Sequence, residues 1–439
     1  MPLLLPTNGA WFPRTTGHRP SGIAPRCGGM PRQEGALREG WEGPGVAGQG
    51  DYLSLADRNV LAASAERRGE GSAMVEVTGY AAHGSLSHQL KPMRFERNEP
   101  RPTDVLIEVL YCGVCHADIH QVRNEWKNTL YPCVPGHEVV GRVIGKGVAV
   151  TKFAVGDIVG VGCMMDSCRI CPACLKGEEN YCEGPNSWLA TYNGPQVPTA
   201  KAPTHENMYG CDNTFGGYST ALVIPEPFVL RIPKGLSPKS AAPVLCAGVT
   251  TYSALKHWGV KTGDAVGIVG LGGLGHLAVK LAIAMGAQVT VFTTSTDKEV
   301  PARALGAKRV VLQEDTSAHR RLRSSFDFIL STAPQKHEVN PFIELLKRDR
   351  TLAVCGALEA LPPINTMEMA LHRRSVAGSL IGSVAETQEV LGFCALHGIS
   401  PEVELIPMQK INEAFKKVEN GEVLFRYVVD MASLKQDGN

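Results

Sequence analysis

Residues 265–275 read AVGIVGLGGLG, and this stretch decides the fold. Its first five residues form an apolar run that predicts a short buried strand, and residues 276–285 continue with the apolar spacing of a helix. Between strand and helix stand Gly270, Gly272, Gly273 and Gly275. Glycines in this context permit a tight turn, and the helix N-terminus offers unpaired N–H groups to a pyrophosphate. The stretch therefore predicts a dinucleotide site, with a ligand-free glycine-rich turn as the alternative.

Strands and helices continue to alternate beyond this turn. Apolar strand patterns recur at 288–292, 326–330 and 352–354, and a helical pattern ending at Leu305 separates the first two. Such alternation is typical of a doubly wound parallel sheet. We therefore predict an α/β fold in which residues 247–383 form a Rossmann domain.

The end of the second strand of this domain indicates which dinucleotide is bound. An acidic residue there normally binds both ribose hydroxyls of NAD, but no Asp or Glu occurs between the glycine turn and Asp297. The strand leads instead into Thr293, Thr294 and Ser295, and Lys298 follows. Hydroxyl groups and an ammonium group can bind a 2′-phosphate, so the sequence predicts NADP(H). The alternative is a plain loop with Asp297 as a helix cap.

Four cysteines lie within 15 residues of one another, at Cys168, Cys171, Cys174 and Cys182. Four thiolates at these short spacings can complete a tetrahedral zinc shell that is closed to water. The pattern predicts a structural zinc in a lobe spanning residues 163–183. Two disulfides or four unrelated buried thiols are the alternatives.

A catalytic metal would need an open coordination position and ligands from distant segments of the chain. The candidate ligands are Cys112, Cys115, His116, His120, His137, Glu138 and Cys246. Spacing alone does not choose among them, because a lone Cys or His is more often a packed core residue.

Composition and hydrophobic pattern change along the chain and suggest domain boundaries. Residues 1–73 are rich in Gly, Pro and Arg without apolar periodicity, which predicts a disordered extension. We expect Met74, where a strand pattern opens, to be the natural start of translation. The codons of residues 69–71, just before it, would then be the ribosome-binding sequence of the gene. Short apolar runs punctuated by Gly and Pro predict a β-rich domain over 74–246. Residues 384–439 carry a helix and a final strand and are expected to return to that domain.

Composition excludes several classes of function. Lys and Arg number 44 against 43 Asp and Glu, which gives a net charge of +1 and predicts no nucleic-acid partner. The apolar stretches around 266–292 are broken by His276, Lys280 and glycines, so no membrane span is expected. Thirteen cysteines without a secretory leader pattern predict reduced thiols and a cytoplasmic protein.

From about Met74 to Leu434 the sequence resembles the zinc-dependent medium-chain alcohol dehydrogenases, in particular the cinnamyl-alcohol-dehydrogenase group with its bacterial NADPH aldehyde reductases. The motifs that carry the resemblance are residues 113–116, 136–138, the four-cysteine lobe, 245–252, the glycine turn and 425–430. The resemblance implies a GroES-like catalytic domain beside the Rossmann domain, and a homodimer formed through the nucleotide domains. It also implies interconversion of aldehydes and primary alcohols by hydride transfer with NADP(H), with reduction as the expected direction.

The same resemblance implies roles for particular residues. Cys115, His137 and Cys246 would bind a catalytic zinc, with Glu138 adjacent to the metal. Asp118 would orient the ligand histidine and increase its basicity. The zinc would polarise the carbonyl oxygen of the aldehyde substrate while NADPH delivers hydride.

Residues that contact the cofactor follow from the same motifs. Thr250 corresponds to a threonine beside the nicotinamide, and Arg426 to an arginine near the pyrophosphate. The residues that would hold the extra phosphate are Thr293, Thr294, Ser295 and Lys298.

One departure from the family concerns proton transfer. Two residues after the first ligand the family carries Ser or Thr, whereas this chain has Ala117, which has no hydroxyl. A water in that space could connect the substrate oxygen to His120, so we expect a working but slowed enzyme. The alternative function is a zinc-stabilised NADP-binding sensor or scaffold.

A second departure is the long loop from Glu183 to Phe215. It contains Trp188, followed by a run at 191–193 that resembles the substrate-pocket loop of the group. An aromatic wall would favour flat or long apolar aldehydes. The alternatives are that Trp188 merely packs the loop down, or that a more polar pocket accepts a sugar alcohol or polyol.

Overall fold

The computed structural model describes residues 74–86, 89–184, 191–194, 213–357, 359–423 and 425–436. All of them belong to one compact unit, residues 70–439. The extension predicted at 1–73 and the pocket residue Trp188 lie outside the described residues.

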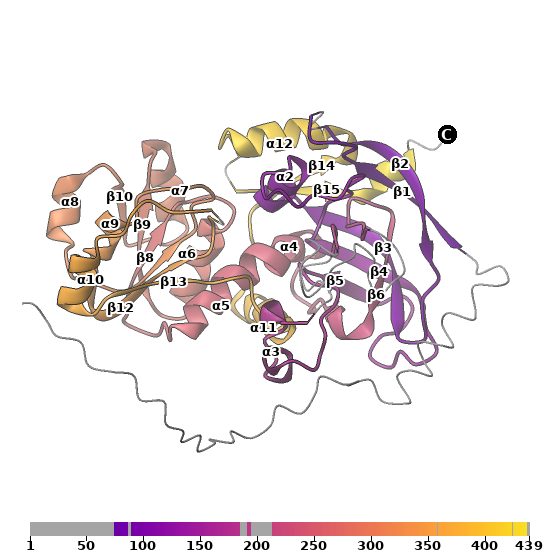
Figure 1. The fold of residues 1–439 in the computed structure, drawn as a ribbon, viewed down its shortest axis with the longest axis horizontal. Helices are drawn as coiled ribbons and strands as arrows, with labels where there is room; N and C mark the ends of the chain where they lie inside the picture. Colours follow the sequence, from indigo (N-terminus) through magenta and orange to yellow (C-terminus); the bar gives the residue numbers. More distant parts are fainter. Residues whose placement is uncertain are drawn as a thin grey trace, which may run out of the picture. The chain divides into compact units, whose positions relative to one another are not determined.

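One of the large sheets has six strands, all parallel to one another (Figure 1). In chain order they are β8 (Ala265–Val269), β9 (Gln288–Thr293), β10 (Arg309–Leu312), β11 (Phe326–Ser331), β12 (Leu346–Val354) and β13 (Ser375–Gly378). Their spatial order is β10-β9-β8-β11-β12-β13, so the winding reverses between β10 and β11. This is the strand order of the doubly wound dinucleotide-binding fold, and it confirms the predicted fold class. The carboxyl end of β8 lies at the switch point, where ligands bind in such sheets.

Helices cover both faces of the parallel sheet. They are α5 (Val249–His257), α6 (Gly275–Ala284), α7 (Glu299–Ala304), α8 (Thr316–Arg321), α9 (Asn340–Ile343), α10 (Thr366–His372) and α11 (Val384–His397). One core joins apolar residues of α5, α6 and α11 to the sheet, and a second core joins those of α8, α9 and α10. Strand β8 supplies both cores, with Ile268 in the first and Val269 in the second, because successive side chains of a strand point to opposite faces.

The second large sheet is mostly antiparallel. Its strands are β3 (Asp104–Gly113), β4 (Val139–Lys146), β5 (Ile158–Val161), β6 (Ala221–Pro225), β7 (Leu230–Arg231), β14 (Val403–Pro407) and β15 (Arg426–Asp430). They lie in the order β14-β15-β3-β4-β5-β7, and β6 also pairs with β3. A separate hairpin joins β1 (Met74–Ala81) to β2 (Lys91–Asn98). The central strand is therefore β3, and its last residues enter the functional site.

Short helices connect the strands of the second sheet. They are α2 (His116–Val122), α3 (Pro172–Leu175), α4 (Pro238–Pro243) and α12 (Ile411–Glu419). A π-helical turn, Val244–Gly248, joins α4 to α5 and carries Cys246. Single-turn 3₁₀ segments occupy 179–181, 226–228, 296–298 and 408–410, and a longer one occupies 431–436.

The C-terminal segment adds strands to the second sheet and a helix to the core beside the parallel sheet. Strands β14 and β15 extend the second sheet, where Val429 pairs with Cys112 of β3 (Figure 1). Helix α11 instead buries Val390, Leu391 and Cys394 in the core that contains α5 and α6. The domain boundary at residues 383 and 384 remains a prediction.

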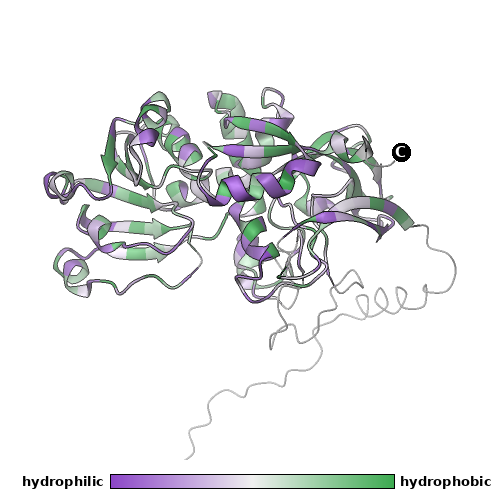
Figure 2. Cartoon of the chain, turned by 90° about the horizontal axis from the view of Figure 1, so that it is seen from above, coloured by the Kyte–Doolittle hydropathy of each residue, from purple (hydrophilic) through white to green (hydrophobic). Residues whose placement is uncertain are grey.

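Hydrophilic and hydrophobic residues alternate along the helices that cover the sheets, as expected for helices with one buried face (Figure 2). Among the described residues, no helix combines the length and apolar character needed to cross a bilayer.

Candidate metal centre and nucleotide site

Four buried side chains from three distant segments converge at the ends of β3 and β4. Cys115 follows β3 and begins α2, His137 and Glu138 precede β4, and Cys246 lies in the π-helical turn. One possible ligand atom from each of the four lies within 4.8 Å of all the others. We call these four residues the ligand cluster. The π-helical turn brings a cysteine that is remote in sequence to the end of β3, and such turns are frequent at functional sites.

Glycines make the approach of these segments possible. At Gly136, whose φ is +102°, an added Cβ would lie 2.7 Å from the Tyr218 nitrogen and 2.9 Å from Cys112 Sγ. At Gly113 an added Cβ would lie 1.9 Å from Glu138 Oε2. The glycines of the two motifs are therefore needed for close packing around the cluster.

Asp118 organises the cluster from behind. Its Oδ1 accepts hydrogen bonds from His137 Nδ1 at 2.9 Å and from the Gly136 N–H at 3.0 Å. Its Oδ2 accepts one from the Cys115 N–H at 3.1 Å. Because Nδ1 of His137 is the donor to this carboxylate, Nε2 is the nitrogen left for a metal.

Burial and neighbouring charges set the protonation of the cluster. Burial by itself would lower the pKa of His137, but the Asp118 carboxylate outweighs burial and raises it well above its usual value. A hydrogen bond from Cys246 lowers the pKa of Cys115 well below its usual value, and the pKa of Cys246 is raised by its bonds to Cys115 and Cys163. A thiolate is therefore already favoured at Cys115, and thiolate is the form that binds zinc.

Glu138 and Arg426 form an ion pair beside the cluster. Arg426 Nη2 lies 3.1 Å from Glu138 Oε1, and both side chains are almost fully buried. Neither carboxylate oxygen of Glu138 accepts a hydrogen bond from a described residue. Burial raises the pKa of Glu138 to about 7 against the opposing charge of Arg426. The carboxylate is thus restrained on one side only.

These donors fit a zinc ion. Two sulfurs and one imidazole nitrogen are the donor types that Zn²⁺ prefers, and a shell with Zn–S of about 2.3 Å and Zn–N of about 2.0 Å places its ligand atoms roughly 3.5 Å apart. The observed limit of 4.8 Å accommodates that shell after small shifts of the side chains. Three such ligands leave a fourth position open, as a catalytic site requires.

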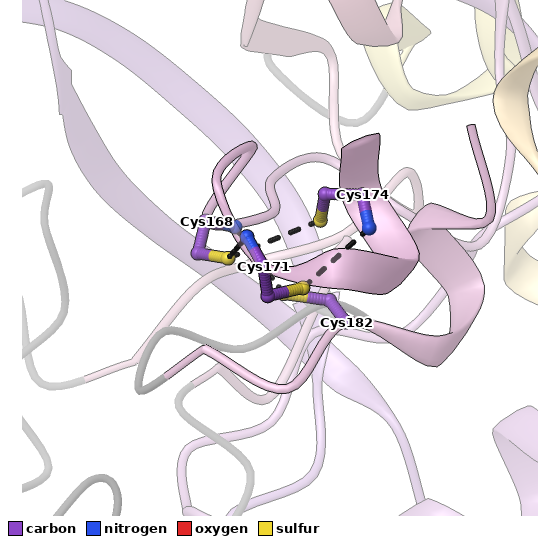
Figure 3. Close-up of side chains that lie close together, drawn as sticks. All are labelled: Cys168, Cys171, Cys174 and Cys182. Carbon is purple, nitrogen blue, oxygen red and sulfur yellow. Dashed lines mark hydrogen bonds between the residues drawn. The ribbon is translucent and has the colours of Figure 1, made fainter. Parts of the chain in front are cut away.

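The four-cysteine lobe is the second group of possible metal ligands (Figure 3). Cys168 Sγ and Cys174 Sγ are 3.9 Å apart, and the N–H of Cys171 donates to Cys168 Sγ at 3.3 Å. Backbone N–H groups of Glu183 and Cys174 lower the pKa of Cys171 to about 6. Peptide donors that point at sulfur are suited to thiolates, so the lobe fits a closed shell of four sulfurs.

The lobe is tied to the segment that precedes α11. Asn180 Nδ2 donates to the Leu380 carbonyl at 2.8 Å, and the Leu380 N–H donates to the Tyr181 hydroxyl at 3.4 Å. The lobe therefore links the second sheet to the start of α11.

The glycine turn has the geometry of a phosphate cradle. Gly270 adopts φ +90°, and a Cβ at Gly275 would lie 2.2 Å from the Gly270 carbonyl oxygen, so the turn tolerates no side chain there. Helix α6 begins at Gly275 with no side chain capping its first N–H groups. The His276 N–H donates to the Gly272 carbonyl at 3.1 Å, and the positive end of the helix dipole faces the turn, where it favours an anion.

Arg426 connects this turn to the ligand cluster. The Arg426 side chain forms an ion pair with Glu138 and also packs against Gly273. A Cβ added at Gly273 would lie only 2.8 Å from Arg426 Nε. Its Nη1 donates to the Val114 carbonyl at 3.0 Å, which fixes the side chain beside the first ligand. One guanidinium therefore lies between the two predicted sites.

The residues predicted to bind the 2′-phosphate lie together after β9. Thr294 is exposed, Ser295 and Lys298 are half-buried, and Lys298 makes no ion pair with another described residue. The hydroxyl of Thr293 accepts a hydrogen bond from the Ser295 N–H at 3.3 Å and thereby shapes the turn. Thr250 lies in the first turn of α5, directly after the segment that carries Cys246.

Two predicted proton-relay positions lie on α2. The ring of His120 is 6.1 Å from that of His116, and its Nδ1 pairs with the Glu125 carboxylate. No hydrogen bond between described residues joins His120 to the ligand cluster. The other position, Ala117, carries no hydroxyl that could transfer a proton.

Sequence reasoning did not single out three neighbours of the cluster. Tyr218 donates from its hydroxyl towards Asp118 Oδ2 at 3.3 Å, and Cys163 bonds to Cys246. The ring centroid of Tyr192 lies 5.7 Å from that of His137. These three residues reach the cluster through packing between distant segments. Only Tyr192 had a sequence signal, because it lies in the run at 191–193 that resembles the substrate-pocket loop.

The sequence matches two families. Residues 101–234 match the alcohol dehydrogenase GroES-like domain, and residues 273–395 match the zinc-binding dehydrogenase family. The chain is 48% identical over 353 residues to aldehyde reductase YahK of Escherichia coli (strain K12), covering 80% of this chain and 97% of the relative. It is 44% identical over 361 residues to NADP-dependent alcohol dehydrogenase C of Mycobacterium bovis, covering 82% and 100%.

Solved structures give the same result. A cinnamyl alcohol dehydrogenase from Sorghum bicolor superposes with a TM-score of 0.76 at 39% identity, covering 82% of this chain and 98% of that chain. A cinnamyl alcohol dehydrogenase from Helicobacter pylori complexed with NADP(H) has a TM-score of 0.73 at 37% identity, covering 82% and 99%. The chain therefore belongs to the zinc-dependent medium-chain alcohol dehydrogenases, in their cinnamyl-alcohol-dehydrogenase group.

Proposed function

We propose that the protein interconverts aldehydes and primary alcohols by hydride transfer with NADP(H), with aldehyde reduction as its main direction. The observation that carries this proposal is the contact made by Arg426. This side chain pairs with Glu138 of the ligand cluster and packs against Gly273 of the nucleotide turn. A carbonyl substrate at the ligand cluster and a dinucleotide at the glycine turn would thus be neighbours, as hydride transfer requires.

The residues of the cluster have separate roles in this proposal. Cys115, His137 and Cys246 hold the catalytic zinc, and Asp118 fixes the ring orientation of His137 through the bond at Nδ1. Glu138, paired with Arg426, would lie beside the bound ion and add a carboxylate to its surroundings. When bound, zinc supplies a Lewis acid and NADPH supplies the hydride.

The four sulfurs of the lobe hold the second zinc, which has a structural role. The nucleotide domain provides the cofactor site, with the pyrophosphate at the glycine turn and Arg426 beside it. Thr250 faces the nicotinamide. Thr293, Thr294, Ser295 and Lys298 receive the 2′-phosphate, and the absence of Asp and Glu between the glycine turn and Asp297 favours NADP over NAD.

Proton transfer needs a water in this enzyme. His120 is the group that exchanges the proton with solvent, and its Nδ1 is paired with Glu125. Because Ala117 offers no hydroxyl, a water in its place completes the connection to the substrate oxygen. Tyr192, packed beside His137, supplies an aromatic wall that favours flat apolar aldehydes.

The names of the similar proteins agree with this activity. They include an aldehyde reductase, an NADP-dependent alcohol dehydrogenase and cinnamyl alcohol dehydrogenases, one of them complexed with NADP(H). The alternative of a catalytically weak sensor or scaffold rests on Ala117 alone, whereas the chain retains every residue of the ligand cluster.

The test is a panel of aldehydes mixed with the purified protein and either NADPH or NADH. We expect loss of the reduced-nicotinamide absorbance with NADPH and much slower loss with NADH. A Lys298→Glu variant should lose most of its rate with NADPH while its rate with NADH changes little. A flat trace with every aldehyde would support the scaffold instead, and equal rates with both cofactors would contradict the assigned phosphate site.

We further propose that the protein forms a homodimer through β13, an edge strand of the parallel sheet. Its sequence, Ser375–Gly378, has no charge or proline to block pairing with a second copy. Beside it, α10 exposes Met367 and Leu371 by 66% and 67%, one turn apart on the same face. The opposite edge, β10, begins with the exposed Arg309 and is less suited to pairing.

We place the protein in the cytoplasm. The described cysteines form no disulfide, and the proposed sites need at least six of them as free thiols. A reducing compartment keeps thiols available for zinc.

A further inference from the structure

We propose that Tyr218 is a positioning residue for the catalytic metal site, acting through Asp118 on the orientation of His137. This inference rests on the proposed function, because it assigns His137 as a zinc ligand. Tyr218 lies 100 residues beyond Asp118 in the chain, and its hydroxyl lies 3.3 Å from Asp118 Oδ2.

Four donors lie at hydrogen-bond distance from the Asp118 carboxylate, two on each oxygen, and the Tyr192 side chain also hydrogen-bonds to it. On Oδ1 they are His137 Nδ1 at 2.9 Å and the Gly136 N–H at 3.0 Å. On Oδ2 they are the Cys115 N–H at 3.1 Å and the Tyr218 hydroxyl at 3.3 Å. The carboxylate thus bonds to two of the three ligand-bearing segments, those of Cys115 and His137, and Tyr218 is the one donor among these four that belongs to neither.

Burial makes the hydrogen bond from this hydroxyl important. Asp118 and Tyr218 are both fully buried, and a buried carboxylate depends on its hydrogen bonds because no solvent replaces them. The Gly113 carbonyl, at 3.4 Å, is the other acceptor within reach of the Tyr218 hydroxyl. A single proton can serve one of these acceptors at a time, and the charged carboxylate is the stronger one.

Backbone hydrogen bonds from the Tyr218 segment also hold the turn that precedes His137. The Tyr218 N–H donates to the Pro135 carbonyl at 2.9 Å, and the Gly217 N–H donates to the Gly136 carbonyl at 2.8 Å. Arg97 of β2 fixes the segment from outside, donating to the Phe215 carbonyl at 2.8 Å. The segment therefore presents the Tyr218 hydroxyl to Asp118 from a fixed position, on the side of the carboxylate opposite His137 Nδ1.

The consequence concerns the metal. With Oδ2 held by Tyr218 and Cys115, the carboxylate cannot rotate, and Oδ1 stays aligned with Nδ1 of His137. Loss of the Tyr218 hydroxyl removes one of the donors to Oδ2, so the carboxylate rotates more freely and His137 is less well aligned with the zinc. Partners of this kind beyond the direct ligands are known to influence metal affinity.

The test is Tyr218→Phe, which removes only the hydroxyl. We expect one of the two zinc ions to be lost to a chelator about 3- to 10-fold faster than in the wild type, because one net hydrogen bond is removed. The rate of loss of the other zinc should not change. In cobalt-substituted enzyme, the visible bands of the catalytic site should shift. The matched control is Tyr252→Phe, which removes a buried phenol that donates to the Glu389 carboxylate at 2.7 Å.

A double-mutant cycle separates positioning from general stability. In an Asp118→Asn background, Tyr218→Phe should no longer accelerate zinc loss, since its effect passes through the carboxylate. Equal acceleration in both backgrounds, or a lower unfolding temperature with unchanged zinc loss and cobalt spectrum, would overturn the proposal. If the wild type fails to reduce aldehydes while the cycle behaves as expected, the positioning role stands and the proposed function fails.

Discussion

Ala117 is the residue at which we expect the proton path to differ from that of the family. It lies on α2 between the ligand Cys115 and the relay position His120, whose imidazole is paired with Glu125. A hydroxyl missing at one step of a proton path affects rate without affecting metal binding, because the ligands do not depend on it.

We predict that Ala117→Ser and Ala117→Thr increase the rate of aldehyde reduction. Positioned proton transfer contributes roughly 10²–10⁴-fold in enzymes, and a water already recovers part of this, so a gain of about 10-fold is expected. Steady-state rates with NADPH across the pH range measure it. Ala117→Val, which has the shape of threonine without the hydroxyl, is the control and should show no gain. Equal rates for Thr and Val would mean that the hydroxyl is irrelevant here.

At the scale of elements, helix α6 joins the nucleotide turn to the core. Its second residue, His276, is fully buried, its ring stacks on Phe425 at 4.7 Å, and its Nδ1 lies 3.3 Å from the Gly272 carbonyl. Burial, aided by the charge of Arg426, lowers the pKa of His276 to about 3. The folded protein therefore keeps this imidazole neutral at pH values where an unfolded chain protonates it.

This predicts a dependence of stability on pH. Because the folded pKa lies below the unfolded value of about 6.5, the contribution is complete above pH 6.5 and declines as the pH falls towards 3. Between pH 7 and 5 the wild type should lose about 2 kcal/mol of unfolding free energy through this group, and His276→Gln should not show that loss. Urea unfolding at the two pH values measures it, with His397→Gln, an exposed replacement on α11, as the control. Parallel losses in His276→Gln and the wild type would contradict the assignment.

Elements with local signals were predictable from the sequence. The strand, glycine turn and helix at 265–285 follow from adjacent residues, and their strand order confirms the fold class. Strand β10 was not predicted, because three apolar residues after Arg309 are too short a run to distinguish a strand from a loop. Helix α11 begins at Val384, where Ser383 and Glu386 form a capping box that their spacing in the sequence also indicates.

The site was less predictable than the fold, for a physical reason. Spacing did not choose the metal ligands, since Cys246 reaches Cys115 through a π-helical turn that no local pattern indicates. The resemblance supplied the choice. Tyr218 had no signal at all, because its contact with Asp118 depends on packing between segments 100 residues apart.

At the scale of the whole molecule, the proposed dimer places β13 of two copies side by side. A two-fold axis there would continue the sheet across both subunits and cover Met367 and Leu371 of α10. The proposed catalytic site lies within one chain, since all residues of the ligand cluster and the nucleotide turn belong to it. Activity should therefore not require residues from a second subunit.

We predict that Met367→Glu combined with Leu371→Glu converts dimers to monomers, because charges on a buried apolar interface are not solvated. Light scattering coupled to size-exclusion chromatography measures the mass. The control is Val300→Glu on α7, which places a charge on a residue 76% exposed elsewhere. A wild-type protein that is already monomeric, or a double variant that stays dimeric, would contradict the proposed interface.

The central claim is that Cys115, His137 and Cys246 hold a zinc ion distinct from that of the four-cysteine lobe. The most direct measurement is the zinc content per chain of the wild type and of Cys246→Ala after identical reconstitution. The account predicts two zinc ions in the wild type and one in the variant, with the remaining ion in the lobe. One zinc in the wild type, or two in Cys246→Ala, would contradict it.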